Sequence, residues 1–388
     1  MTRGPRNAAS RSQLALELMT AFADRTVLTS DGPPDRYLWT DALAVCNFLT
    51  LGRTDMALQL VDQVHAVLGR FGPGDARVGW LSGLDDESAR EHPTIAGLRI
   101  GKQLAERGPR ETIDPRLEWE RDGQYFHYLT KWMHALDQVA RATDRPDLNR
   151  WARELAATAF RAFTVADPGG MSGPRHMYWK MSVDLTRPLV ASMGHHDPLD
   201  GYVTCCELQV TAARLGARDG PDLRAEAAAF GAMIPADLAT DDLLGIGGLL
   251  CDAWRVEQLS DQDEGLSGPD VRDRLLDAAV TGLAARDVAW DLALPADERL
   301  AFRELGLAIG LAAVRRMAES SAGGPAIDRA AGFVDIGSSI EMCWLDPVHR
   351  RNQTWTDHRN INDVMLATCL QPDGFLIVRP RSAAAMGT

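Results

Sequence analysis

A repeated pairing of two kinds of helix constrains the fold of this chain more than any other feature of its sequence. Residues 39–51 are apolar on nearly every face of a helix, whereas residues 54–68 carry apolar side chains at the spacing i, i+3, i+4 and i+7. The first pattern is typical of a helix buried all round, and the second of a helix with one face in solvent. The local unit is therefore a buried helix followed by a half-buried one.

The same pairing recurs along the chain. The paired ranges are 36–53 with 54–68, 123–142 with 147–163, 199–215 with 222–230, 242–259 with 269–285, and 298–317 with 328–341. A last helix at 361–370 can pair with an N-terminal helix at 12–25. Such pairs fit an open superhelix or a closed ring, but repeat arrays usually keep a strict sequence period, which this chain lacks. We therefore predict an all-α fold, an (α/α)6 barrel or toroid of about six helical hairpins.

The predicted barrel occupies residues 11–380 as a single domain, with a disordered N-terminus at 1–10 and a tail at 381–388. Within the domain, residues 72–122 are rich in Gly, Pro and charged side chains around a short predicted helix at 94–106. A connection of this length is usually functional or disordered. We interpret it as a lid or as part of a pocket rim, with an ordered surface excursion as the alternative.

The charge and the hydropathy of the chain exclude some classes of partner. The formal net charge of −13 argues against a nucleic-acid surface, which needs a basic face. No segment reaches the roughly 18 apolar residues of a membrane span, and no apolar run of signal-peptide length lies near the start. The six cysteines lie mostly in apolar helical patterns without a CxxC pair, as buried thiols in a reducing compartment do. We expect a cytoplasmic protein with neither membrane nor nucleic acid as partner.

Several familiar catalytic motifs are absent. The sequence has no GxSxG elbow, no GxxxxGK[ST] phosphate loop and no HExxH zinc motif. The Gly-rich run at 245–248 lies inside an apolar helix, so it indicates close helix packing rather than phosphate binding. The acidic runs at 85–87 and 261–264 lack the DDxxD spacing of terpene synthases, which leaves terpene cyclisation a distant alternative.

Polar and aromatic side chains concentrate in two stretches. The denser one, at 176–211, surrounds a Pro/Gly turn that leads into an apolar helix, and the second, at 344–363, precedes the last helix. This density exceeds what a loop needs for solubility. We therefore interpret 176–211 as the densest part of a binding or catalytic site, which ring closure would bring within reach of the second stretch.

Three helix openings carry a resemblance to known proteins. They are RYLWTDALAV (36–45), RDGQYFHYLTKWMHALDQV (121–139) and HHDPLDGYV (195–203). With the helical rhythm of most of the chain, they resemble the six-hairpin glycosidase-like superfamily of (α/α)6 barrels, which includes N-acylglucosamine 2-epimerases and unsaturated glucuronyl hydrolases. The resemblance implies a pocket at one end of the ring, lined by the starts of inner helices and by the loops before them.

The resemblance also implies chemical roles. The unsaturated glucuronyl hydrolases use an aspartate at the start of an inner helix as general acid/base, and Asp200 and Asp41 are similar in placement. The epimerases use a pair of histidines, for whose C-terminal member His358 is the only candidate by position. The resemblance therefore favours a hydrolase over an epimerase.

The residue types themselves suit sugar chemistry. Glycoside hydrolysis commonly needs one protonated and one ionised carboxyl group, and aromatic faces stack on sugar rings. Asp41 and Asp200 each lie next to aromatic and apolar residues, although ordinary helix capping is the alternative role for both. His127 and Lys131 share a helical face four residues apart and can present a base beside a cation.

The candidate site residues follow from these patterns. The predicted catalytic residues are Asp41, Asp200, His127 and His196. The predicted substrate-binding residues are Tyr37, Trp39, Tyr125, Lys131, Trp179, Arg187, His195, Asp197, Trp355 and His358. The histidines and aspartates at 195–200 also permit a metal site, but adjacent residues rarely reach one ion and no HxxxH spacing supports it. We predict neither a metal nor a cofactor.

The favoured function is that of a carbohydrate-active enzyme, a glycoside hydrolase that uses carboxylate general acid/base catalysis on a small or oligomeric sugar. A sugar 2-epimerase or isomerase that uses histidines is one alternative. A non-catalytic helical scaffold or ligand-binding protein is the other. The identity of the sugar, the stereochemistry and the oligomeric state stay open at this stage.

Overall fold

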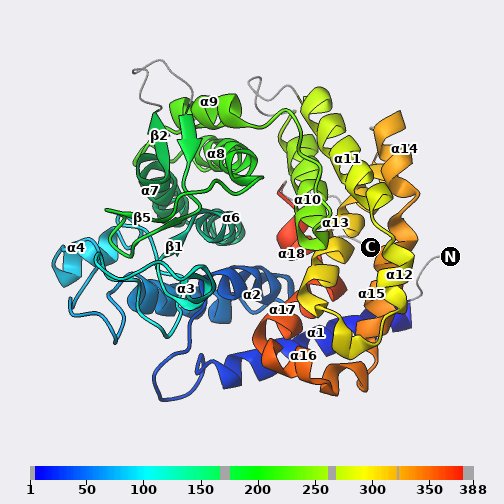
Figure 1. The fold of residues 1–388 in the computed structure, drawn as a ribbon, viewed down its shortest axis with the longest axis horizontal. Coiled ribbons are helices and arrows are strands. Elements are labelled where there is room, and N and C mark those ends of the chain that lie inside the picture. The colour runs from blue at the N-terminus through cyan, green and yellow to red at the C-terminus, as the bar shows by residue number, and fades with distance from the viewer. Residues whose placement is uncertain (1–4, 167–174, 261–267, 321–322, 379–388) are drawn as a thin grey trace. The chain divides into compact units, whose positions relative to one another are not determined.

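The computed structural model describes residues 5–166, 175–260, 268–320 and 323–378, and these are mostly helical (Figure 1), which confirms the predicted all-α class. The predicted tail at 381–388 lies outside the described residues. The chain divides into two compact units. Unit 1 comprises residues 1–22, 50–52 and 236–388, and unit 2 comprises residues 23–49 and 53–235.

Unit 2 is built around three helices that contact one another, namely α6 (Phe126–Thr143), α7 (Pro146–Phe163) and α8 (Asp197–Arg214) (Figure 1). Its other helices are α2 (Leu38–Thr50), α3 (Thr54–Leu68), α4 (Asp86–Glu91), α5 (Pro115–Glu120) and α9 (Arg224–Met233). Two small antiparallel sheets complete the unit, one with the strand order β1-β4-β5 and one that pairs β2 with β3. The strands are β1 (Gln124–Tyr125), β2 (Thr164–Ala166), β3 (Arg175–Met177), β4 (Lys180–Met181) and β5 (Pro188–Val190).

Unit 1 is centred on α13 (Ala301–Glu319), which contacts four other helices. These are α10 (Leu243–Leu259), α14 (Pro325–Ala331), α15 (Val334–Leu345) and α17 (Arg359–Leu370). The unit also holds most of α1 (Pro5–Arg25), together with α11 (Gly268–Ala285), α12 (Val288–Ala293), α16 (Gln353–Asp357), α18 (Asp373–Leu376) and the 3-10 turns Ala296–Glu298 and His349–Arg351. The middle of α13 is buried all round, as its apolar sequence predicts.

Most of the predicted helices are present with ends shifted by a few residues. Three regions differ, namely 328–341, 5–10 and, as described below, 94–106. The range 328–341 is divided between α14 and α15, because α14 ends at Ala331 and Gly332 follows as its C-cap. Helix α1 begins at Pro5, so residues 5–10 are helical where the sequence pattern predicts disorder.

The Gly-rich run in α10 permits close helix packing, as predicted. A Cβ atom on Gly247 would collide with the carbonyl oxygen of Gly306 on α13. A Cβ atom on Gly310 would lie 2.6 Å from the carbonyl oxygen of Gly247. Because only glycine lets the two backbones approach this closely, these positions set the distance between α10 and α13.

The predicted helix at 94–106 is wrong, for a conformational reason. Gly97 and Gly101 have φ angles of 78° and 98°, which interrupt any right-handed helix. A Cβ atom on Gly101 would collide with the carbonyl oxygen of Arg36. The segment is instead held by Asp122, which pairs with Arg99 and accepts a hydrogen bond from the Gly101 N–H at 3.1 Å. It is an ordered part of unit 2.

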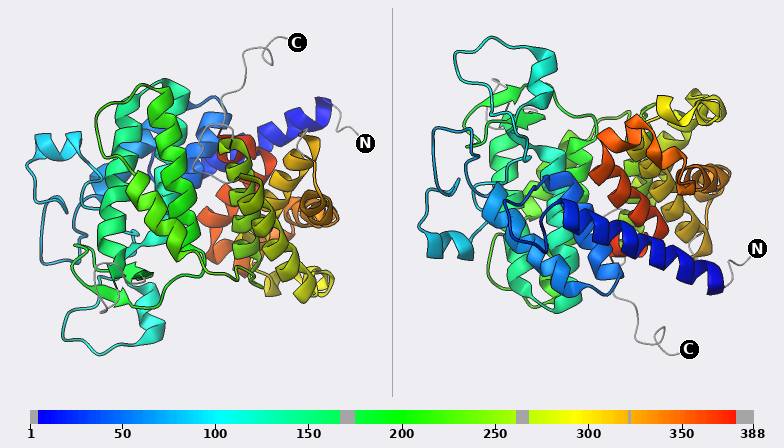
Figure 2. Two further views of the ribbon diagram at one scale, coloured as in Figure 1. Left: turned by 90° about the horizontal axis from the view of Figure 1, so that it is seen from above. Right: turned by 90° about the horizontal axis from the view of Figure 1, so that it is seen from below.

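The first helix, α1, contacts the C-terminal end of α17 within unit 1. Arg11 on α1 donates hydrogen bonds to the carbonyl oxygens of Cys369 and Leu370, at 3.2 and 3.4 Å. These carbonyls lie at the C-terminal end of α17, where free backbone acceptors need donors. Figure 2 shows the blue N-terminal helix beside the red C-terminal one. A side chain of α1 therefore contacts α17, the helix at 361–370 that we predict to pair with the N-terminal helix.

Two further sequence expectations concern burial and length. All six cysteines are free thiols, and five of them are buried, as their apolar surroundings predict. No helix within the described ranges combines the length and the apolar character that a membrane crossing requires.

Candidate functional site

Aromatic rings from four segments of unit 2 form a continuous cluster. The ring centroids of Tyr125 and Tyr128 lie 5.2 Å apart, and Tyr37, which precedes α2, lies 5.6 Å from Tyr128. On the other side of Tyr125, Trp119 of α5 lies 6.1 Å away and also meets Trp179 at 4.9 Å. We call Tyr37, Trp119, Tyr125, Tyr128 and Trp179 the aromatic cluster. Residues almost 150 positions apart in sequence thus share one surface.

A short sheet brings the members of this cluster together. Tyr125 pairs with Lys180 between β1 and β4, and the N–H of Phe126 at the start of α6 donates to the carbonyl oxygen of Trp179 at 3.4 Å. Gly123 precedes β1 with a φ angle of 149°, and a Cβ atom there would lie 2.7 Å from the carbonyl oxygen of Met181. This close approach needs glycine and fixes the start of α6 against β4, which Trp179 directly precedes.

The cluster is exposed on one side only. Trp119 is 42% exposed, Tyr37, Tyr128 and Trp179 are half-buried, and Tyr125 is buried beneath them. The hydroxyls of Tyr37 and Tyr128 share a hydrogen bond of 2.6 Å, which fixes both rings. A rigid, half-exposed aromatic surface of this kind suits stacking against a flat apolar face of a ligand. Trp39 is buried and supports Tyr128 from 6.5 Å away.

An ion pair lies beside the aromatic cluster, at the starts of α6 and α8. Lys131 donates through Nζ to Oδ1 of Asp200 at 2.9 Å. His127 lies one turn before Lys131, and the charges of Asp200 and Lys131 both act on its pKa. The structure therefore brings together three predicted site residues from two helices.

Asp197 supplies a second carboxyl group one turn before Asp200 on α8. Burial and, to a smaller extent, the negative charge of Asp200 together raise its pKa to about 8. Its Oδ2 atom is buried and has no hydrogen-bond partner in the described structure. Asp197 therefore holds a proton at neutral pH, next to a carboxylate that is paired with a lysine.

His127 is neutral, and its hydrogen bond fixes where its proton lies. Burial lowers its pKa to about 4. Trp179 donates from its indole Nε1 to Nδ1 of His127 at 3.3 Å, so the remaining proton of the imidazole is on Nε2. His127 can thus donate a hydrogen bond to a ligand, but it has no free basic nitrogen with which to abstract a proton.

Asp41 has a different environment from Asp200. Its Oδ2 accepts from the backbone N–H of Tyr37 at 2.9 Å, and its Oδ1 lies 3.5 Å from Nη1 of Arg36. Burial raises its pKa to about 6. The carboxyl group is committed to the start of α2, which matches the alternative of helix capping considered for this residue.

The remaining unit 2 candidates have more peripheral positions. His195 is exposed and His196 is half-buried at the N-cap of α8, and their rings lie 4.8 Å apart. Arg187 donates to the carbonyl oxygen of Arg107 at 2.6 Å. This hydrogen bond gives Arg187 a structural role in joining two loops.

Trp355 and His358 belong to unit 1. Trp355 is only 1% exposed and packs on Trp344 at 5.4 Å, so it has no free face for a substrate. His358 is exposed and lies 5.7 Å from Phe302. The dense 344–363 stretch therefore supplies core and surface residues of this unit.

Trp119 is the member of the aromatic cluster that the sequence patterns missed. It lies in the short helix α5, inside the charged range 72–122 that we interpret as a pocket rim. A lone tryptophan among charged residues is a usable signal, because a surface segment does not otherwise need so large an apolar side chain. Its contact with Trp179 brings this segment to the candidate site.

A second polar cluster lies further along α6 and α8 and is almost completely buried. Asp137 accepts from Asn149 and from Thr211, both at 2.8 Å, and His134 lies 2.9 Å from Glu207. Arg141 reaches Glu207 at 3.1 Å. We call these residues the buried network. It ties α6 to α7 and α8 and is closed to ligands.

Within the described residues, no group of three or more His, Cys, Asp or Glu is arranged to hold a metal ion. The comparisons with known proteins assign no family to this chain. No protein-family model matches the sequence, and no curated protein shows significant similarity to it.

Proposed function

We propose that unit 2 carries a carbohydrate-active site and that the protein hydrolyses a glycosidic bond there. The observation that carries this proposal is the half-exposed aromatic cluster beside the Lys131–Asp200 pair. Sugars offer an apolar face for ring stacking and hydroxyls for charged hydrogen-bonding groups, so this combination of side chains suits them.

The two carboxyl groups at the start of α8 provide the proposed chemistry. Asp197 holds a proton at neutral pH and would give it to the leaving glycosidic oxygen. Asp200, held by Lys131, would stabilise the positive charge that develops at the anomeric carbon as the glycosidic bond breaks, and a water molecule would add to that carbon and return its proton to Asp197. This assignment keeps Asp200 and replaces Asp41, whose carboxyl group is bound to Arg36 and Tyr37. His127 would donate a hydrogen bond to a sugar hydroxyl.

The six-hairpin ring and membership of the glycosidase-like superfamily also remain proposals. The helix pairs and the contact between α1 and α17 support them. A cytoplasmic location is proposed from the six free thiols, which suit a reducing compartment. The closed ring would be supported by small-angle scattering that fits a single compact toroid and contradicted by scattering that fits two separated bodies.

The test of the proposed function has two steps. First, the melting temperature is measured with a panel of neutral monosaccharides, oligosaccharides and uronic acids, because a ligand that binds the folded state raises it. Second, hydrolysis of glycosides of the stabilising sugar is followed for the wild type and for Asp200→Asn. The variant keeps an oxygen that accepts from Lys131, so its melting temperature should stay within a few degrees while turnover falls by at least about a hundredfold.

Asp31→Asn is the matched control, since it removes the same charge from an exposed position of unit 2. It should hydrolyse at the wild-type rate. Hydrolysis by Asp200→Asn at the wild-type rate would refute the role of Asp200. Stabilisation by a sugar without any turnover would instead favour a binding protein or scaffold.

A further inference from the structure

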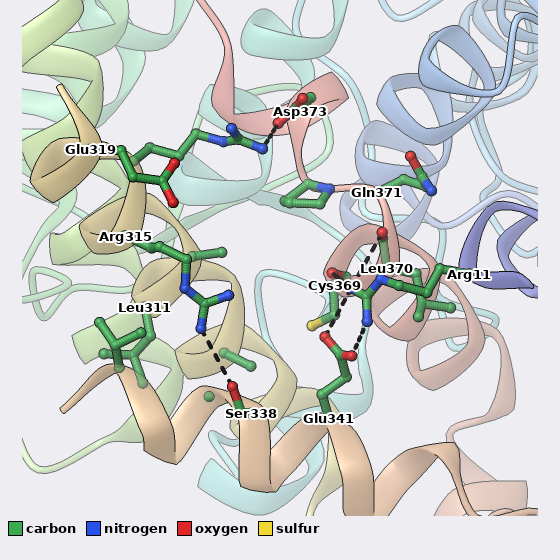
Figure 3. A pocket seen from close by; sticks show the side chains of 16 residues that line it. Arg11, Leu311, Arg315, Glu319, Ser338, Glu341, Cys369, Leu370, Gln371 and Asp373 are labelled. Atoms are coloured by element: carbon green, nitrogen blue, oxygen red, sulfur yellow. Dashed lines mark hydrogen bonds and ion pairs between the residues drawn. The ribbon is translucent and has the colours of Figure 1, made fainter. Parts of the chain in front are cut away.

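Unit 1 contains a cavity that has no part in the proposed sugar site. It has a volume of about 350 Å³ and lies among α1, α13, α15 and the C-terminal end of α17 (Figure 3). A cavity of this size holds a small organic molecule. Charged residues and an apolar wall both line the cavity, so a ligand that fits it should have a charged group and an apolar part.

Two arginines of the cavity lining are paired with acids. Arg11 bonds to Glu341 through two nitrogen–oxygen contacts, and Arg316 pairs with Asp373. The Arg11–Glu341 pair is largely shielded from solvent, with side chains 14% and 12% exposed, whereas the Arg316–Asp373 pair is partly exposed. The charges of these four groups therefore cancel locally.

Arg315 is the third arginine of the lining, and it forms no ion pair within the described residues. Its one hydrogen bond within the described residues is a long one, 3.4 Å, from Nη2 to the hydroxyl of Ser338. Figure 3 shows its guanidinium between the two ion pairs, directed into the cavity. Glu319 lies one helical turn further on but is exposed and forms no ion pair with Arg315 in the described structure. A guanidinium carries five N–H donors, so most of the hydrogen-bonding capacity of Arg315 is unused.

The rest of the lining narrows the class of ligand. Ala308, Leu311 and Val334 form an apolar wall beside Arg315. With the charges of the two ion pairs cancelled, Arg315 and Glu319 are the remaining charged groups of the lining, so a ligand with several negative charges would find only one cation to neutralise it. A planar carboxylate matches the fork of the guanidinium, and one negative charge suffices to neutralise it.

We propose that this cavity binds a small monocarboxylate with an apolar body, whose carboxylate is held by Arg315. The apolar body would lie against Leu311 and Val334. This site is independent of the sugar site, because its residues all belong to unit 1.

Calorimetric titration of the full chain with hexanoate and with benzoate tests the proposal, with inorganic phosphate titrated in parallel. At least one carboxylate should bind with a dissociation constant below about 1 mM, and phosphate should bind more weakly. Arg315→Met should weaken carboxylate binding by at least about tenfold, since a charged hydrogen-bonded pair is lost. Arg351→Met removes the same charge from an exposed position of unit 1 and should leave binding unchanged.

A second variant tests the same group without removing it. Ala312→Glu places a carboxylate one turn before Arg315, where it can pair with the guanidinium and repel an anionic ligand. It should abolish carboxylate binding in a protein that melts as the wild type does. The proposal is overturned if neither carboxylate binds the wild type, if phosphate binds more tightly than both, or if Arg315→Met binds as the wild type.

Discussion

Helices α6 and α8 carry two polar regions that differ in burial and in how fully their polar atoms are bonded. At their starts, Lys131 and Asp200 form a partly exposed pair beside the aromatic cluster, and Oδ2 of Asp197 has no hydrogen-bond partner in the described structure. Further along, the carboxylate oxygens of Asp137 are both bonded, to Asn149 and Thr211.

The difference indicates that polar groups have a structural role in one part of this helix pair and a functional role in the other. A buried polar group that is fully bonded fixes the helices and leaves nothing for a ligand. A buried group that keeps a polar atom without a partner in the described structure, as Asp197 does, bears a cost that a structural role alone does not require. We therefore assign the starts of α6 and α8 to function, and the buried network to stability.

The largest expected effect is on stability, from the buried network. Asp137→Ala removes the acceptor for Asn149 and Thr211. It also removes the ion pair between Asp137 and Arg141. The free energy of unfolding should fall by about 3–5 kcal/mol, as for other broken buried charge networks. Urea unfolding measures this loss. A loss below about 1 kcal/mol would show that the network does not hold the helices together.

The next effect is the pH dependence produced by Asp197. Its pKa is raised to about 8 in the folded protein from an ordinary value of 3.8, so the folded state holds a proton that the unfolded state releases above about pH 4. The stabilising contribution of this proton is fully present below pH 4, falls as the pH rises toward 8, and is gone above that value.

Asp197→Asn stays neutral and lacks this dependence. Relative to the wild type, its stability should therefore increase from pH 4 to pH 9, by a few kcal/mol at the upper end. Urea unfolding at pH 4, 6, 8 and 9 measures the difference. A constant difference between variant and wild type across this range would mean that Asp197 is already ionised in the folded protein at low pH.

The smallest expected effect on stability comes from the aromatic cluster. Trp119 is 42% exposed, so Trp119→Ala should lower the free energy of unfolding by no more than about 1 kcal/mol. Affinity for the stabilising sugar should fall by about tenfold or more, because a stacking face is lost. Trp290→Ala in unit 1, which is 61% exposed, is the control and should bind sugar normally. Equal affinity of the two variants for the sugar would show that Trp119 does not contact it.

The sequence predicted the helices well and the loops poorly, for a physical reason. Helical periodicity is local, so α3, α7 and α10 follow directly from the spacing of apolar residues. The path of 94–106 depends on two glycines with positive φ angles and on the Arg99–Asp122 pair, which apolar spacing does not encode.

The same limit applies to the candidate site. His127, Lys131 and Asp200 lie near one another, because the first two are in the first half of one predicted helix and Asp200 is at the start of another. The prediction that Trp355 binds substrate fails. Its neighbours in sequence are equally polar, but its side chain is buried against Trp344. Density of polar residues marks helix ends, whereas exposure depends on packing between segments far apart in the chain.

The most direct test of the central claim is a crystal structure of the protein soaked with the sugar that raises its melting temperature most. We predict that the sugar ring lies against Trp119 and Trp179, with its glycosidic or anomeric oxygen within hydrogen-bonding distance of Asp197 and its anomeric carbon next to Asp200. A sugar bound elsewhere, or no sugar that binds at all, would contradict the assignment of the starts of α6 and α8 as the functional site.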